Sequence, residues 1–238
     1  MKIERNADPM GMAIHDFAIN GKAGKLRVLS SMFDEDEMPV ANLFRTEMQM
    51  PRIERIALGL CNGHVLDVGA GAGCHTLALE KRGLKVTSID ISILSTEVRT
   101  MQGAKDARCE DLFTANFEEK FDTIILLMNG LGIAGTLKRL PTLLLRCKEL
   151  LAPGGKILAD SSDLRYVFED EDGFLDWDEN DGYYGEVDFE MVYEECHGER
   201  FDWLYVDYET LKSITETCGL KIKKVANGEH YDYLAEIK

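Results

Sequence analysis

Between residues 64 and 162, short apolar runs alternate with segments whose apolar residues recur at helical spacing. Apolar runs of this length predict buried strands, and the longer periodic segments predict the helices that connect them. Strand–helix alternation of this kind predicts an α/β fold with a doubly wound, parallel sheet and right-handed crossovers. We expect strands at 64–70, 85–90, 106–109, 121–129 and 156–162, and helices at 74–83, 93–102 and 137–155.

The alternation of strands and helices does not extend beyond this region on either side. Residues 185–195 and 199–207 alternate around a Cys-His-Gly turn, which predicts an inserted antiparallel β-hairpin. A helix at 210–220 and two strands at 221–227 and 231–238 follow. Residues 1–60 predict an N-terminal helical cover, with helical patterns near 41–49 and 51–60. We therefore divide the chain into this cover and a domain at 61–238 that carries the acidic insert at about 163–209.

A glycine loop lies between the first strand and its helix, where residues 65–76 read VLDVGAGAGCHT. Glycines there let backbone N–H groups approach a ligand and point a helix N-terminus at it. The spacing of Gly69, Gly71 and Gly73 is GxGxG. A nicotinamide fingerprint would need a further glycine at Cys74, so an NAD-linked oxidoreductase is the weaker alternative. No GxxxxGK[ST] phosphate loop occurs, which argues against ATP.

Acidic residues follow the strand ends at positions that suit a nucleoside. Asp90 ends the second strand, 21 residues after Gly69, where a ribose-binding carboxylate is expected. Asp111 follows the third strand and is placed to meet an adenine amine. Either carboxylate taken alone is consistent with an ordinary solvated loop residue. Both carboxylates and the glycine loop together favour a nucleoside site at the carboxyl edge of the sheet.

In order along the chain, the motifs DVGAGAG, SID, EDL, FDTIILLMNGLG and LLAPGGKIL resemble those of class I S-adenosylmethionine-dependent methyltransferases. The resemblance covers residues 60 to 162 and the two C-terminal strands. It implies a Rossmann-like, seven-stranded sheet whose last strand is antiparallel, with S-adenosylmethionine as the cofactor.

The resemblance also implies a role for individual residues around this cofactor. Asp67 would support the glycine loop 69–73, which includes Ala70 and would run under the methionine part. Asp90 would hold the ribose hydroxyls, and Ile91 would lie against the adenine. The exocyclic amine would be framed by Asp111 and Leu112, and the sulfonium would lie beside Met128 and Asn129.

Methyl transfer from a sulfonium needs alignment and desolvation, and needs a base only when the acceptor must lose a proton. Family members that methylate an amide or base nitrogen usually carry [DN]PPY after the fourth strand, and this chain has NGLG there. Cytosine C5 methylation typically uses a Pro-Cys nucleophile, and no Pro-Cys pair occurs. Catechol-type enzymes place a metal-binding Asp where this chain has Asn129. We therefore expect transfer to a small-molecule acceptor. The alternative is a protein that binds S-adenosylmethionine without methyl transfer, as a sensor or assembly partner.

Residues that flank the strand ends are candidates for the acceptor side. Arg45 could bind a carboxylate of the cofactor or substrate, against the ordinary reading of a surface cation. Tyr183 and Tyr184 could line the acceptor pocket, against ordinary hairpin packing. The candidate general bases are His230, His15 and Asp163. For each histidine, a solvated or hydrogen-bonded side chain without a catalytic role is the simpler interpretation.

Charge separates the chain into two parts. Residues 163–209 contain 18 acidic and two basic residues, so this stretch alone accounts for the net charge of −16. That balance argues against a nucleic-acid partner and favours a cationic acceptor. The series Asp176, Asp178 and Asn180 copies positions 1, 3 and 5 of a calcium loop. Asp181 stands where that loop needs glycine and Val187 where it needs glutamate, so we expect no metal. Scattered cysteines, no apolar leader and no membrane span predict a cytoplasmic protein. The sequence leaves the oligomeric state open.

Overall fold

The computed structural model describes residues 2–170, 172, 175–178 and 182–238. Its main sheet has seven strands in the order β11-β12-β7-β6-β3-β4-β5. The strands β3 to β7 pair in parallel, whereas β12 runs antiparallel to both β7 and β11. This confirms the predicted seven-stranded sheet with an antiparallel last strand. The strands are β3 (His64–Val68), β4 (Lys85–Asp90), β5 (Ala107–Cys109), β6 (Phe121–Leu126), β7 (Leu151–Ser162), β11 (Ile222–Asn227) and β12 (Asp232–Ile237).

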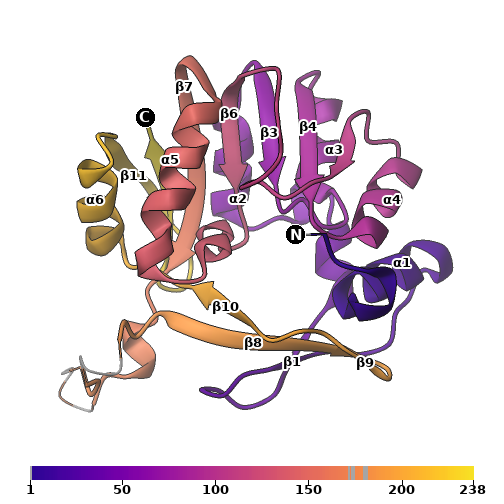
Figure 1. Ribbon diagram of the computed structural model, residues 1–238, viewed down its shortest axis with the longest axis horizontal. Helices are drawn as coiled ribbons and strands as arrows, with labels where there is room; N and C mark the ends of the chain where they lie inside the picture. The colour runs from indigo at the N-terminus through magenta and orange to yellow at the C-terminus, as the bar shows by residue number, and fades with distance from the viewer. Residues whose placement is uncertain (1, 171, 173–174, 179–181) are drawn as a thin grey trace.

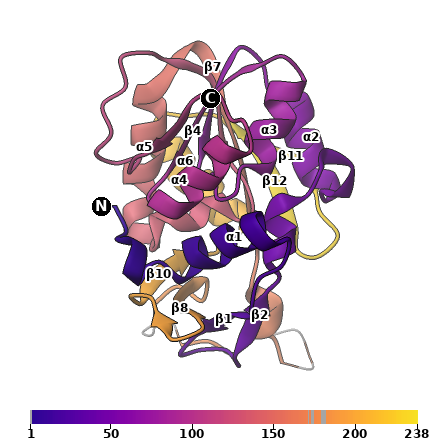
Figure 2. The same cartoon turned by 90° about the vertical axis from the view of Figure 1, so that its right-hand side faces the viewer.

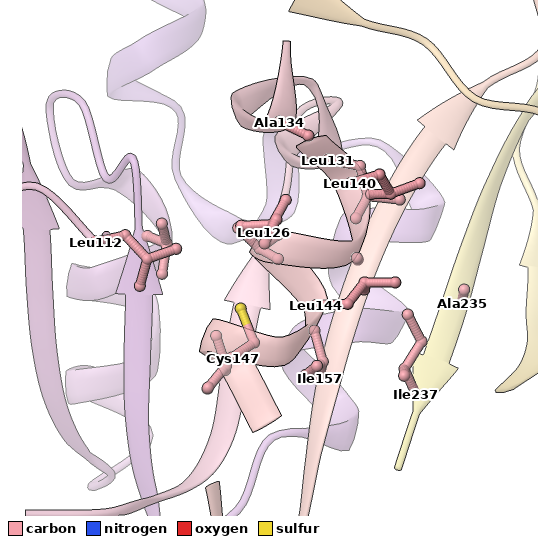
Figure 3. Close-up of a cluster of buried hydrophobic side chains, with 14 of the residues drawn as sticks. Leu112, Leu126, Leu131, Ala134, Leu140, Leu144, Cys147, Ile157, Ala235 and Ile237 are labelled. Atoms are coloured by element: carbon pink, nitrogen blue, oxygen red, sulfur yellow. The ribbon is translucent and has the colours of Figure 1, made fainter. Parts of the chain in front are cut away.

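Helices cover both faces of this sheet (Figure 1). They are α2 (Arg52–Leu60), α3 (Cys74–Lys81), α4 (Ile93–Met101), α5 (Leu140–Leu150) and α6 (Tyr208–Thr217). One hydrophobic core forms against α5 and α6 and contains Leu66 and Ile124. Figure 3 shows part of this core, including Leu126 of β6 and Leu144 of α5. Another forms against α2 and α3 and contains the neighbouring residues Val65 and Ile125. Because successive strand residues enter opposite cores, the central strands carry consecutive apolar residues, such as Ile124–Leu126, rather than an alternating pattern.

Two predicted boundaries need correction. Strand β7 begins at Leu151, not at 156, because Pro153–Gly155 continues the strand after α5 ends at Leu150. The segment 41–49 forms two 3-10 turns instead of a helix, η2 (Val40–Phe44) and η3 (Glu47–Gln49), because Arg45 and Thr46 between them have non-helical ψ values of 141° and 160°.

A second sheet lies across the carboxyl edge of the main sheet (Figures 1 and 2). Its order is β10-β8-β1-β2, with β9 also paired to β8. The predicted hairpin is confirmed, because β8 pairs antiparallel with β10. Its strands are β1 (Leu26–Leu29), β2 (Asp36–Met38), β8 (Glu186–Tyr193), β9 (Cys196–His197) and β10 (Phe201–Leu204).

The N-terminal region is more than a helical cover, because β1 and β2 join the insert in this second sheet. It also contains a helix that the sequence pattern did not predict, α1 (Pro9–Asn20), which packs between α4 and β8. The division of the chain at residue 60 stays a prediction. In the described part of the chain, no helix is long and apolar enough to cross a membrane.

Candidate functional site

The glycine loop turns sharply from β3 into α3 at the carboxyl edge of the main sheet. Gly69, Gly71 and Gly73 have φ values of 69°, 51° and 94°, which side chains rarely adopt. A Cβ on Gly71 would meet nothing within 4 Å, so this part of the loop borders open space. A Cβ on Gly69 would lie 3.3 Å from Ile133 Cδ1, so Ile133 lies close above the first glycine. The loop is therefore a backbone cradle with room beside it.

Asp90 lies at the end of β4 and is fixed at both carboxylate oxygens. The backbone N–H of Gly71 donates to Oδ2 at 2.8 Å, and that of Ser92 donates to Oδ1 at 2.9 Å. An ionised carboxylate has about four acceptor positions, so two remain for further donors. The side chain is 15% exposed. This arrangement suits the two vicinal hydroxyls of a ribose, and the residues present therefore fit an adenosyl cofactor.

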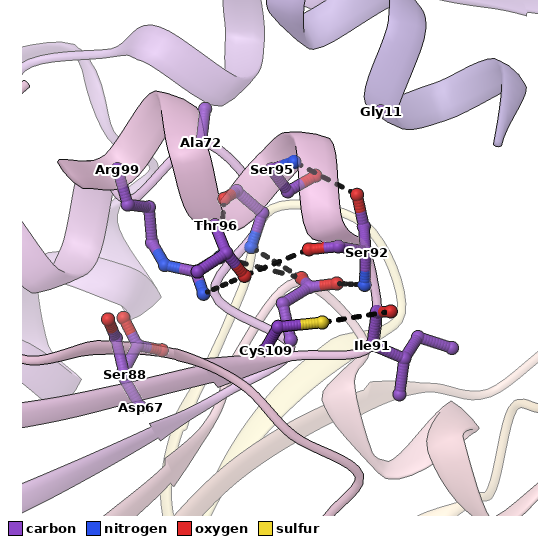
Figure 4. Close-up of polar contacts among 12 residues, drawn as sticks. Gly11, Asp67, Ala72, Ser88, Ile91, Ser92, Ser95, Thr96, Arg99 and Cys109 are labelled. Atoms are coloured by element: carbon purple, nitrogen blue, oxygen red, sulfur yellow. Dashed lines mark hydrogen bonds and ion pairs between the residues drawn. The ribbon is translucent and has the colours of Figure 1, made fainter. Parts of the chain in front are cut away.

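A buried arginine that the sequence pattern did not single out supports this region (Figure 4). Arg99 of α4 is fully buried, and its Nη1 donates to the Gly71 carbonyl at 2.9 Å. The same nitrogen lies 3.9 Å from Asp90 Oδ2, and burial lowers the pKa of the guanidinium. A Cβ on Gly73 would lie 2.9 Å from Arg99 Cγ, so this glycine makes room for the arginine. Arg99 thus fixes the loop and adds positive charge behind Asp90.

Asp67 lies beneath the loop. It is buried, and its Oδ2 accepts a hydrogen bond from Thr76 Oγ1 at 2.5 Å. Burial raises the pKa of this carboxyl. The bond joins the end of β3 to α3 across the glycine loop, as the supporting role implied by the resemblance requires.

Arg45 belongs to a buried ion cluster rather than to the surface. Its Nη2 donates to both Glu54 oxygens at 2.9 Å and lies 3.5 Å from Met128 Sδ. Glu54 also contacts His75 Nε2 at 2.7 Å. Burial alone would lower the pKa of His75, but hydrogen bonds to Cys74 and Glu54 raise it well above its usual range. Arg45 Nε is buried and has no partner among the described residues.

Met128 and Asn129 follow β6 in left-handed backbone, with φ of 62° and 58°. Asp160 of β7 stabilises this turn by accepting from the N–H groups of Met128 (3.1 Å), Asn129 (2.8 Å) and Gly130 (3.3 Å). The Asn129 side chain accepts from Ser161 Oγ and donates to the Leu204 carbonyl, so it ties β6 to β7 and to β10. The Met128 side chain is 36% exposed beside Arg45, whereas that of Asn129 is committed to the scaffold.

The adenine-side residues lie after β4 and β5. Ile91 is 39% exposed, as a stacking surface requires, whereas Leu112 is 4% exposed and packs in the core of α5 and α6. Asp111 Oδ1 accepts from the Phe113 N–H at 2.9 Å, which closes a tight turn. The roles of these three residues stay predictions.

The structure brings Tyr184 and Asp163 together at the end of β7. Tyr184 Oη donates to Asp163 Oδ1 at 2.8 Å, and Tyr183 Oη donates to Asp207 Oδ2 at 2.7 Å. The two rings lie 4.5 Å apart. Burial raises the pKa of both phenols, which therefore stay protonated. These bonds join the insert to the carboxyl end of β7 and to the start of α6.

Aromatic residues of the second sheet, which sequence reasoning missed, lie close to the same edge. Trp203 of β10 packs on η4 (Gly130–Ala134), because a Cβ on Gly132 would lie 2.1 Å from Trp203 Nε1. Phe201 and Trp203 are spaced two apart in β10, and Tyr205 continues this spacing one residue beyond the strand. The rings of Phe201 and Tyr205 contact Phe189 of β8, at centroid distances of 6.2 and 6.4 Å. No described residue hydrogen-bonds to Trp203 Nε1 or Tyr205 Oη. The period-two spacing of Phe201, Trp203 and Tyr205 was the available signal.

The two histidines lie far apart along the edge. His230 is exposed in the turn after β11, the edge strand. His15 is half-buried in α1, which packs against α4 near the opposite end of the strand order. Neither ring has a hydrogen-bond partner among the described residues. The structure thus separates the two histidines from each other. It places the His230 turn near Asp163, because the Asp163 N–H donates to the carbonyl of Tyr231, the residue after His230, at 3.0 Å.

Within the described ranges, no group of three or more His, Cys, Asp or Glu side chains could hold a metal ion. Of the acidic run compared with a calcium loop, Glu179, Asn180 and Asp181 lie outside the described residues. Asp176 and Asp178 are exposed.

Comparisons with known proteins agree with this geometry. Residues 66–159 match the family model described as a methyltransferase domain. A S-adenosylmethionine-dependent methyltransferase from Bacteroides fragilis, solved with S-adenosylhomocysteine, is 52% identical over 100% of this chain and 97% of its own, with a TM-score of 0.94. One from Clostridium acetobutylicum ATCC 824 is 18% identical over 78% of this chain and 87% of its own, with a TM-score of 0.57, and shows the same fold.

Among curated relatives, the ubiquinone biosynthesis O-methyltransferase of Histophilus somni (strain 2336) is 30% identical over 131 residues. The match covers 50% of this chain and 52% of that enzyme, so it spans about half the length of the relative.

Proposed function

We propose that this chain, which belongs to the family of S-adenosylmethionine-dependent methyltransferases, transfers a methyl group to a small-molecule acceptor at the carboxyl edge of its main sheet. The observation that carries the proposal is the whole-chain similarity to a methyltransferase solved with S-adenosylhomocysteine. The glycine cradle and the doubly anchored carboxylate of Asp90 support it independently.

Bound S-adenosylmethionine supplies an electrophilic methyl group for in-line displacement. The loop Gly69–Gly73 would hold its methionine part, with Asp67 fixing the turn from below. Asp90 would accept from the ribose hydroxyls, while Ile91, Asp111 and Leu112 would enclose the adenine. Arg45 is a candidate for a carboxylate of the cofactor or the acceptor, since its guanidinium lies beside Met128. These residues act by alignment and by exclusion of water.

On the acceptor side, we assign binding to the aromatic residues Phe201, Trp203 and Tyr205, together with Tyr183 and Tyr184. A cationic acceptor suits this set, because ammonium groups bind favourably over aromatic faces. The acidic insert would attract such an acceptor through its summed field. If the acceptor must lose a proton, Asp163 is the best placed of the three candidate bases, because β7 neighbours β6. A cytoplasmic location without a nucleic-acid partner also stays part of the proposal.

The test combines binding with turnover. Isothermal titration with S-adenosylmethionine and S-adenosylhomocysteine should give micromolar dissociation constants that are lost in Asp90→Ala. A panel of small amines, phenols and carboxylic acids is then screened for release of S-adenosylhomocysteine. Binding without release from any acceptor would favour the alternative of a binding protein, and no binding by folded protein would overturn the site.

The cationic-acceptor proposal has its own test. Neutralising Asp176 and Asp178 should raise the KM for an amine acceptor at low salt and should have little effect at high salt, where screening is strong. Affinity for S-adenosylhomocysteine should not change. An unchanged KM at low salt would contradict a steering role for the insert.

A further inference from the structure

The N-terminal clasp, residues 2–20, lies across the carboxyl ends of β4 and β5. The Ile3 N–H donates to the Ile91 carbonyl at 3.0 Å, and Ile3 forms a parallel bridge with Ser92. Two ion pairs accompany this contact, Lys2–Glu110 at 3.6 Å and Arg5–Glu97. The clasp therefore borders the segments to which we assign the ribose and the adenine.

Asp8 anchors the clasp from a buried position, being 2% exposed. Its Oδ1 caps α1 by accepting from the Gly11 N–H at 2.7 Å. Its Oδ2 accepts from Ser92 Oγ at 2.5 Å. Ser92 Oγ in turn caps α4 by accepting from the Ser95 N–H at 2.9 Å. A single hydrogen bond thus joins the N-terminal caps of two helices.

Capping alone does not explain this contact, because the Gly11 N–H already satisfies the capping role of Asp8. The close approach is specific: a Cβ on Gly11 would lie 2.1 Å from Asp8 Oδ2 and 2.7 Å from Ser92 Oγ. Glycine at this position lets α1 reach the turn after β4 (Figure 4). Asp8 and Asp90 both accept a hydrogen bond from Ser92, and burial, together with the nearby Asp90 carboxylate, raises the pKa of Asp8.

Ser92 links this anchor to the candidate ribose site, because its backbone N–H donates to Asp90 Oδ1. We propose that Asp8 is a positioning residue, which acts through Ser92 to fix the Asp90 carboxylate for the ribose hydroxyls. The inference rests on the proposed cofactor role of Asp90. Its physical basis is preorganisation: a carboxylate already held in its binding orientation loses less conformational freedom when a ligand binds.

The experiment measures how strongly the protein discriminates between adenosine and 2′,3′-dideoxyadenosine, by displacement of S-adenosylhomocysteine in isothermal titration. We expect the wild type to prefer adenosine by at least about tenfold, since two hydroxyls bond to a charged acceptor. In Asp8→Asn, the preference should fall to within about threefold. Ser92→Ala breaks the same hydrogen bond from its other side and should give the same fall, whereas Ser92→Thr should retain the preference.

Asp16→Asn is the matched control. Asp16 also lies on α1, but its carboxylate accepts from Tyr193 Oη at 2.7 Å, away from Ser92. This variant should keep the wild-type preference. Thermal unfolding confirms that each variant is folded. If Asp8→Asn does not fold, the comparison of Ser92→Ala with Ser92→Thr tests the proposal instead.

A further variant, Asp90→Asn, separates the two claims. If it retains the preference for adenosine, the ribose role of Asp90 is wrong, and the inference fails with it. If Asp90→Asn abolishes the preference while Asp8→Asn and Ser92→Ala keep it, only the positioning role is overturned. Equal weakening of both nucleosides in Asp8→Asn would also overturn it, since the clasp would then merely cover the site.

Discussion

The carboxyl group of Asp160 makes stability depend on pH in a direction that is unusual for an aspartate. It is 5% exposed on β7 and accepts from three backbone N–H groups of the turn at 128–130. Burial raises its pKa from 3.8 to about 7, against the opposing effect of those hydrogen bonds. The folded protein therefore binds a proton here over a pH range in which the unfolded chain has released it.

The sign follows from proton linkage. Between pH 3.8 and about 7 the native state holds one proton more at Asp160 than the unfolded state, so stability falls as pH rises. The slope for one proton is about 1.4 kcal/mol per pH unit. Over the whole interval this amounts to about 4 kcal/mol, and between pH 5 and pH 8 to about 3 kcal/mol. The contribution is fully present below the unfolded pKa and is lost as pH passes the folded pKa.

The perturbation is Asp160→Asn, which keeps the shape and removes the titration. Urea unfolding of wild type and variant is followed at pH 5, 6, 7 and 8. The wild-type minus variant difference in unfolding free energy should fall by about 3 kcal/mol over this range. Asp176→Asn, at an exposed position, should show a nearly constant difference. A flat or rising difference for Asp160→Asn would refute the assignment of a raised pKa to this carboxyl.

Three further predictions follow from single contacts. Arg45→Met should lower the affinity for S-adenosylhomocysteine by about tenfold or more in isothermal titration. Adenosine, which lacks the carboxylate, should bind as before. An equal loss of affinity for both ligands would exclude a carboxylate-binding role for Arg45. Gly132→Ala should lower the unfolding free energy by about 1–3 kcal/mol, because the new Cβ would lie 2.1 Å from Trp203 Nε1. As the control, Gly59→Ala in α2 should raise the melting temperature, because its Cβ would meet nothing within 4 Å and alanine favours a helix. Ser161→Ala should destabilise by about 1–3 kcal/mol in urea unfolding, because the buried Val206 N–H, 2.9 Å from Ser161 Oγ, loses its acceptor; an unchanged midpoint would mean that this N–H finds another partner.

Much of the main sheet was predictable because its signals are local. The apolar run at Phe121–Leu126 and the Pro-Gly-Gly after α5 act over a few residues, and the strand order follows from right-handed crossovers. The gathering of the glycine loop and Asp90 at one edge of the sheet was predictable for the same reason, since two neighbouring parallel strands bring their carboxyl ends together; the hydrogen bond from Gly71 to Asp90 was not predicted. The start of β7 was misplaced because Pro153 and Gly154 signal a loop as well as a bulged strand. The end of β6 was placed three residues too late, because the apolar run continues past Leu126 into the turn at Met128 and Asn129.

The second sheet and the buried ions were not predictable in this way. The pairing of β1 with β8 joins distant parts of the chain, and no local pattern specifies such a partner. Arg99 was overlooked because an arginine in a helix normally faces solvent, although it shares its helical face with the buried Ser95 and Val98. Likewise, Arg45 is recognisable as a buried ion only once Glu54 and His75 are seen beside it.

The construction of the second sheet from both halves of the chain affects how the protein folds during its synthesis. Strands β1 and β2 leave the ribosome early, but the strand that pairs with β1 on its other side is β8. The parallel strands β3 to β7 are all synthesised in between. Domains begin to fold while the chain is still being synthesised. The edge of β1 that pairs with β8 therefore stays unpaired while the strands β3 to β7 form the main sheet. The aromatic strand β10 can close over η4 only after β8 and β10 have been synthesised, and until then β1 keeps an edge that another chain could pair with.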